Sequence, residues 1–64
     1  MDEQNSQLDW QRAEKHLVAA ERAYTSIGLP GTFALNFVIR PARIRFDTGE
    51  RTKELYMEIM EIEI

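Results

Sequence analysis

The sequence predicts a small all-α domain of three helices, in which the central helix is kinked or broken at a proline. Apolar residues recur at helical spacing in the first segment, polar residues line one side of the middle segment, and strong helix formers fill the last. The chain has 64 residues, enough for one domain, and its 44% apolar and 30% charged residues favour a globular fold over a disordered chain. We predict a single domain over residues 1–64, with a disordered N-terminus over 1–5 and a frayed C-terminus over 62–64.

The first predicted helix spans residues 6–27, with Asn5 or Ser6 as its cap. Its apolar stripe has steps of 3, 4, 3, 4 and 3 residues and consists of Trp10, Ala13, Leu17, Ala20, Tyr24 and Ile27. The two alanines leave shallow gaps, so a second helix can approach closely at these positions.

Glycine and proline mark the end of this helix. Gly28 suits the left-handed C′ position, and Pro30 prevents continuation. Leu29 can fold back onto Tyr24. Residues 30–32 then form a turn, and Thr32 is the expected cap of the next helix.

The second predicted helix spans residues 32–48 and contains Pro41. Nearly all its polar residues lie on one side, at steps of 4, 4, 3 and 4, namely Thr32, Asn36, Arg40, Arg43 and Asp47. The other residues make this helix apolar over most of its circumference, which is typical of a helix at the centre of a bundle. Proline inside a helix costs about 3 kcal/mol. We therefore expect a kink or break near Arg40, with Pro41 in the first turn of the second half and Gly49 as the C′ residue.

The third predicted helix spans residues 52–62, and Thr52 caps it. One face carries Leu55, Ile59 and Ile62, with Tyr56 and Met60 beside them. The acidic residues of this segment lie on the opposite side, namely Glu54, Glu58 and Glu61. The alternating Glu and Ile residues after 60 fit a helix poorly, so we expect a frayed or extended end.

An alternative fold is α+β. Residues 42–47 alternate between apolar and polar side chains, as a half-buried strand does. In this alternative, strands near 33–39, 42–47 and 53–62 form a three-stranded antiparallel sheet behind the N-terminal helix.

Charge is unevenly distributed along the chain, whose net charge is −3. Residues 32–49 carry three arginines and one aspartate, whereas residues 50–64 carry five glutamates, one arginine and one lysine. This pattern predicts that the basic middle pairs with the acidic tail, within one chain or between chains. An acidic total with only three clustered arginines argues against direct nucleic-acid binding.

Motifs of catalysis and metal binding are weak in this sequence. Asp47-Thr48-Gly49 matches the three-letter aspartic protease signature, but the chain is too short and too helical for the barrel that this chemistry requires, so we interpret it as a capping turn. His16 is the only histidine, there is no cysteine, and no second ligand stands at helical spacing from the histidine. The acidic residues of 54–61 could hold a hard cation, but a salt-bridged or partner-facing surface is the better interpretation. We predict no enzyme activity, no metal and no cofactor.

The N-terminus lacks the basic and apolar regions of a signal peptide, and no apolar run approaches the roughly 18 residues of a membrane span. We therefore expect a cytoplasmic protein that does not enter a membrane. Without cysteines a chain of this size has no disulfide to support its small core. Its apolar residues are also many for the surfaces it can bury. Both points predict a homodimer or an accessory subunit of a larger protein.

The function predicted from these observations is a non-enzymatic interaction or regulatory module that acts through helix-mediated oligomerisation or docking on a larger protein. The candidate partner-binding residues are Trp10, Arg40, Arg43, Arg45, Glu54, Glu58 and Glu61. The alternative is a small nucleic-acid-associated regulator that contacts phosphates through Arg40, Arg43 and Arg45.

Overall fold

The computed structural model describes the backbone of residues 3–64 and the side chains from Gln7 onwards. Its elements are α1 (Glu3–Ile27), α2 (Leu29–Ala34), the π-helical turn η1 (Leu35–Ile39), α3 (Arg40–Asp47) and α4 (Lys53–Met60). α2, η1 and α3 follow one another without interruption, and we call this rod, residues 29–47, the central helix. Residues 3–64 thus form three helices and no strand, which confirms the all-α prediction against the α+β alternative.

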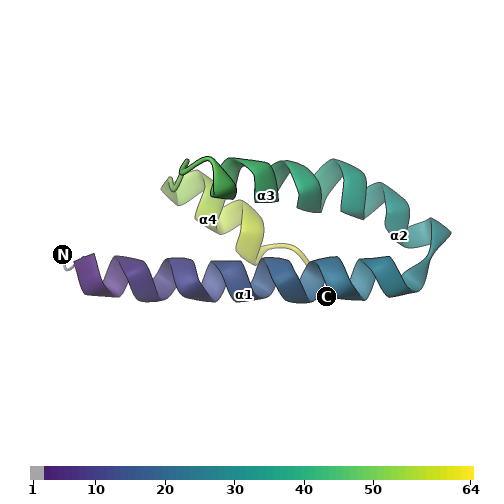
Figure 1. Cartoon of the computed structure of the whole chain (residues 1–64), viewed down its shortest axis with the longest axis horizontal. Helices are drawn as coiled ribbons and strands as arrows, with labels where there is room; N and C mark the ends of the chain where they lie inside the picture. The colour runs from purple at the N-terminus through teal and green to yellow at the C-terminus, as the bar shows by residue number, and fades with distance from the viewer. Residues whose placement is uncertain (1–2) are drawn as a thin grey trace.

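The helices form an elongated molecule of 42 × 16 × 16 Å (Figure 1). The central helix runs back along α1 in the opposite direction, and α4 lies beside both of them. After α4 the chain ends near the middle of α1.

α1 begins at Glu3 rather than at residue 6, so the predicted caps at Asn5 and Ser6 are wrong. Of the segment expected to be disordered, residues 3–5 belong to this helix, and residues 1–2 lie outside the described residues. The predicted stripe is confirmed at its centre, where Ala13, Leu17 and Ala20 are fully buried.

The junction between α1 and the central helix differs from the prediction. The central helix begins at Leu29, with Pro30 in its first turn, where the missing N–H of proline removes no helical hydrogen bond. Thr32 therefore lies inside the helix, where its hydroxyl donates to the Gly28 carbonyl (3.2 Å) instead of capping. Leu29, predicted to fold back onto Tyr24, is instead almost fully exposed. Ile27 is also exposed, because the chain reverses direction between these two residues.

The interruption expected at Pro41 takes the form of a π turn. The Arg40 N–H donates to the Leu35 carbonyl five residues back, and Arg40 keeps helical dihedral angles (φ −62°, ψ −44°). Pro41 then stands in the first turn of α3, as predicted. A π turn inserts an extra residue into the helix without breaking its course, so the central helix adapts to proline and continues.

α3 ends at the predicted glycine. Gly49 has φ +92°, its N–H donates to the Phe46 carbonyl (3.1 Å), and the Glu50 N–H donates to the Arg45 carbonyl (3.0 Å). These two bonds form a Schellman motif. Asp47-Thr48-Gly49 is thus a helix terminus, in agreement with the capping interpretation.

α4 begins where predicted, with the Thr52 hydroxyl accepting a hydrogen bond from the Leu55 N–H (3.1 Å). It ends at Met60, two residues earlier than predicted. Residues 62–64, expected to be frayed, lie outside the helix but contact α1. His16 Nε2 lies 2.6 Å from the Ile62 carbonyl oxygen, and the Tyr24 hydroxyl donates to the Glu63 carbonyl (2.6 Å).

The core is small and lies where the three helices meet. Its buried members are Ala13, Leu17, Ala20, Ile39, Ala42, Phe46, Leu55, Ile59 and Ile62, with Trp10, Tyr24, Leu35, Tyr56 and Met60 packed partly buried around them. Met57 is exposed, in contrast to Met60. The buried alanines let the helices approach closely, so a few large residues suffice to fill the interior.

Candidate functional site

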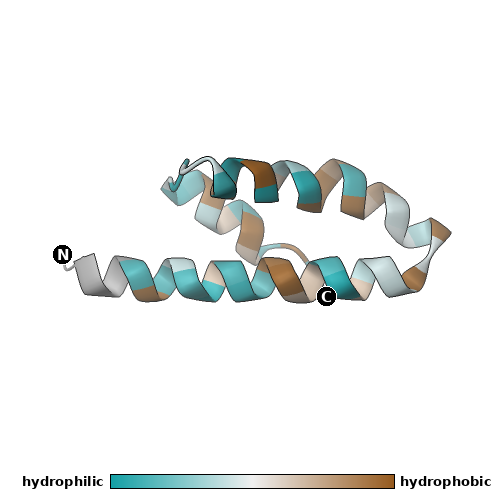
Figure 2. Ribbon diagram, in the orientation of Figure 1, coloured by the Kyte–Doolittle hydropathy of each residue, from teal (hydrophilic) through white to brown (hydrophobic). Residues whose placement is uncertain are grey.

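The most distinctive surface of the protein is a row of exposed apolar side chains on the central helix. Leu29 is 88% exposed, Phe33 and Phe37 are each 67% exposed, and Ile44 is 63% exposed. Pro41 is exposed between them. We call this set the outer apolar stripe. Figure 2 shows apolar residues recurring along the whole central helix, whereas much of α1 is hydrophilic.

Helical geometry explains the position of the stripe. Its members are spaced 4, 4, 4 and 3 residues apart, so they fall on one line along the helix. The buried side of the same helix carries Gly31, Ile39, Ala42 and Phe46, with the partly buried Leu35. In a helix, the residue that follows a buried residue by two positions points to the opposite side. The central helix thus has two apolar sides, and α1 and α4 cover one of them.

Two rings make up the middle of the stripe. The centroids of Phe33 and Phe37 lie 4.9 Å apart with their planes inclined by 30°. Stacked aromatic rings hold each other in place, so these side chains offer a firm apolar surface. Val38 flanks them and is partly exposed (37%).

The predicted arginines do not form one patch. The Arg45 guanidinium donates to Glu50 (Nε to Oε2, 2.8 Å) and to Glu58 (Nη1 to Oε2, 2.9 Å). These two hydrogen bonds raise the pKa of Arg45 above its ordinary value, so it stays protonated. Arg43 lies 3.4 Å from Asp47 on the same helix (Nε to Oδ2). Arg40 is exposed on the polar side of the central helix. We call this side, with Thr32, Asn36, Arg40, Arg43 and Asp47, the polar flank.

The predicted acidic residues of α4 have different surroundings. Glu58 joins Arg45, which realises the expected pairing of the basic middle with the acidic tail within one chain. Glu54 and Glu61 are exposed. Among residues 7–64, whose side chains the structure describes, no three His, Asp or Glu side chains gather as metal ligands would. The three glutamates therefore do not converge on a common point.

Trp10 belongs to an aromatic cluster at one end of the core. Its ring lies 5.8 Å from the Phe46 ring and 5.5 Å, edge to face, from the Tyr56 ring. The Arg51 guanidinium lies over the Phe46 ring, 4.3 Å from its centroid. Such a cation–π contact depends on tertiary packing, and sequence reasoning did not identify Arg51. Trp10 is therefore mostly committed to internal packing.

His16, the one histidine, also has an internal role. Its Nε2 must carry a proton to donate to the Ile62 carbonyl, 2.6 Å away. The imidazole thereby connects α1 to the C-terminal segment.

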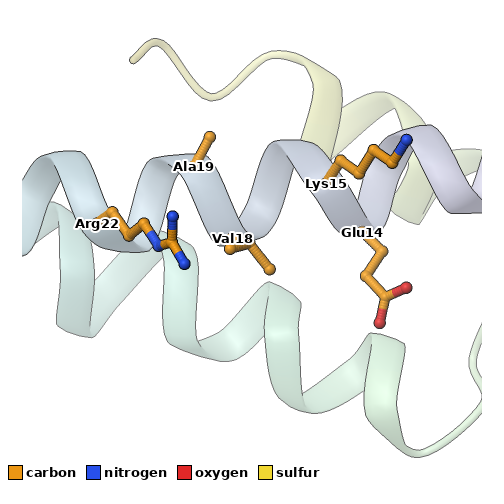
Figure 3. Close-up of a pocket in the computed structure, with 5 residues that line it drawn as sticks. All are labelled: Glu14, Lys15, Val18, Ala19 and Arg22. Carbon is orange, nitrogen blue, oxygen red and sulfur yellow. The ribbon is translucent and has the colours of Figure 1, made fainter.

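A hollow of about 530 Å³ lies on the outer side of α1 (Figure 3). The residues that line it all come from this single helix: Glu14, Lys15, Val18, Ala19 and Arg22. In Figure 3 their side chains project to both sides of the helix and do not converge. A ligand needs polar groups directed at one point, so this hollow has the character of an uneven surface rather than a binding site.

Comparison with known proteins adds no assignment: no family model, no curated protein and no solved structure matches this chain. None of the helices in residues 3–64 is both long enough and apolar enough to cross a membrane. The outer apolar stripe is the feature that sequence reasoning located only in part. The spacing of four residues from Leu29 to Pro41 was the available signal.

Proposed function

We propose that this protein is a non-enzymatic interaction module that docks through the outer apolar stripe. The observation that carries the proposal is the stacked pair Phe33 and Phe37, each two-thirds exposed on a helix whose other side is already packed. Monomeric proteins rarely expose contiguous apolar patches of more than a few hundred Å². Aromatic residues are enriched at the centre of protein interfaces, where they contribute most of the binding energy.

The shape of the stripe fits this role. Its five members follow the length of the central helix, so the surface is long and narrow, as in grooves and faces that bind another helix. No charged residue interrupts the stripe, while Arg40 and Asp47 lie on its polar flank. An apolar centre with a polar rim is the usual anatomy of a protein interface.

The chemistry of the chain supports a binding role over catalysis. The usual nucleophile and base pairs need cysteine or a free histidine beside a hydroxyl group. The chain has no cysteine, and its single histidine is bonded to the Ile62 carbonyl. The alternative of phosphate binding gains no support from the arginines, since Arg43 and Arg45 face carboxylates.

The test compares the size of native complexes that contain the chain. In a gently prepared lysate, the wild type should elute in a complex larger than its 7.5 kDa monomer. A variant with Phe33→Ser and Phe37→Ser should elute as the monomer. Val18→Ser, on the outer side of α1, is the matched control and should elute like the wild type.

Circular dichroism of each purified variant checks that it keeps its helices. The proposal is overturned if the wild type elutes as a monomer, or if the double variant keeps the large complex while remaining helical.

A further inference from the structure

The outer apolar stripe also contains information about its occupant. We infer that a second copy of this chain covers it, packed antiparallel with a two-fold axis beside Phe37. This inference rests on the proposed function, because it names the partner of the same surface.

The stripe is nearly symmetric about Phe37. Toward the N-terminus, apolar residues stand 4 and 8 positions away, at Phe33 and Leu29, and toward the C-terminus they stand 4 and 7 positions away, at Pro41 and Ile44. An antiparallel two-fold axis at Phe37 therefore brings apolar residues together along the whole stripe. The two Phe37 rings meet, Phe33 meets Pro41 of the partner subunit, and Leu29 meets Ile44 of the partner subunit. A two-fold interface has to be self-complementary in this way.

The exposed area suits a dimer of small subunits. A buried aromatic side chain covers about 150–250 Å², so a ring that is two-thirds exposed can still bury about 100–170 Å². Phe33 and Phe37 both have that exposure, and Leu29, Ile44 and the edge of Val38 extend the patch. The total reaches several hundred Å², which can form the apolar centre of an interface of about 800 Å² per partner.

The charges beside the stripe favour the antiparallel arrangement. In this geometry the polar flank of one copy faces the same flank of the other. Arg40 and Arg43 then lie opposite Asn36 and Thr32 of the partner subunit, whose oxygens accept hydrogen bonds, and like charges do not meet. The dipoles of two antiparallel helices also attract each other, whereas those of two parallel helices repel.

The experiment uses the absence of cysteine from the chain, which makes every introduced cysteine unique. The purified wild type should sediment at micromolar concentration with twice its 7.5 kDa mass. Three single variants, Phe37→Cys, Leu29→Cys and Ile44→Cys, are then oxidised separately and in mixtures. We expect Phe37→Cys to form a covalent dimer by itself. Leu29→Cys and Ile44→Cys should form one efficiently only when mixed, because a disulfide requires Cα atoms within about 7 Å.

Val18→Cys is the control for collisional cross-linking, since it places a cysteine on the outer side of α1. A wild type that stays monomeric at every concentration overturns the inference. The proposed function is then judged separately by the size of the native complex in the lysate. A dimer that cross-links Leu29→Cys with itself and not with Ile44→Cys is parallel, and this also overturns the inference. So does a dimer that cross-links efficiently only through Val18→Cys, because its interface is on another side.

Discussion

The close approach of α1 and α2 at Gly31 gives the sharpest stability prediction. A Cβ atom at Gly31 would lie 2.5 Å from the Tyr24 carbonyl oxygen and 3.2 Å from the Ile27 Cβ. Nonbonded heavy atoms prefer about 3.5–4.0 Å, so Gly31→Ala requires the two helices to separate by about 1 Å. The obstructing atom belongs to the backbone of a long helix, so it cannot turn aside as a flexible side chain does.

The expected effect combines two opposing contributions. Overpacking costs about 1–3 kcal/mol, and an obstruction by backbone 2.5 Å away places this site in the upper part of that range, at about 2–3 kcal/mol. Replacing glycine by alanine inside a helix stabilises by about 1 kcal/mol. We expect Gly31→Ala to lower the free energy of unfolding by about 1–2 kcal/mol, a large share of the roughly 3–5 kcal/mol of such a small domain. The melting temperature should fall by about 4–8 °C for each kcal/mol lost.

The assay is urea unfolding followed by far-ultraviolet circular dichroism. All variants are compared at one fixed protein concentration, because association makes the apparent stability depend on concentration. Gln11→Ala, an exposed position on α1 and outside the outer apolar stripe, is the control and should leave stability equal or a few tenths of a kcal/mol higher. If Gly31→Ala is as stable as the wild type, or more stable, then α1 and α2 do not approach each other this closely at Gly31.

Three further predictions concern the contacts of single side chains. Thr52→Ala removes the hydroxyl that accepts from Leu55 N–H and should cost about 1 kcal/mol in urea unfolding, while Thr52→Ser should restore most of it. Trp10→Ala removes the ring that touches Phe46 and Tyr56, and a loss of about 3–5 kcal/mol should leave the chain largely unfolded by circular dichroism; a helical, cooperatively melting variant would contradict this packing. The stability of the wild type should fall as salt rises from about 0.01 M to about 1 M, because the exposed contacts of Arg45 with Glu50 and Glu58 are screened as the Debye length falls from about 30 Å to about 3 Å. Arg45→Met lacks these contacts, so this part of the salt dependence should disappear.

The sign of the Arg45 pKa shift also predicts a flat response to alkali. A group whose pKa is raised on folding contributes fully below its unfolded pKa and loses that contribution only as the pH rises through the folded value. The hydrogen bonds to Glu50 and Glu58 raise the pKa of Arg45 above its ordinary value. Its guanidinium therefore stays charged, and its contacts should contribute equally at neutral and mildly alkaline pH.

Local signals in the sequence were sufficient for much of the fold. The buried faces of α1 and α4 follow from apolar spacing, which a helix converts directly into one side of a cylinder. The cap at Thr52 and the end at Gly49 also follow from the chemistry of single residues. The start of the central helix was missed because proline both ends one helix and suits the first turn of the next. Only the three-dimensional course of the chain distinguishes the two roles at Pro30.

The candidate site could also be predicted only in part from the sequence. The sequence identified Arg40, Arg43 and Arg45 as a basic cluster and predicted that it pairs with the acidic tail. It did not determine which carboxylate each arginine contacts, because Glu58 comes from a different helix and Asp47 competes for Arg43. It likewise missed Arg51, whose position over Phe46 depends on the loop between α3 and α4. Contacts between elements depend on how whole helices dock.

The sequence by itself determined that this protein is helical, where its first two helices end, and that its central helix is apolar around most of its circumference. Only the tertiary structure decided which apolar side of that helix packs inward and which one, with Phe33 and Phe37, is left outside. The physical reason is that periodicity defines the angle of each side chain around its own helix, whereas burial depends on the helices that approach it. Gly31 and the alanines permit the closest approach, so α1 and α4 pack against the side where they stand.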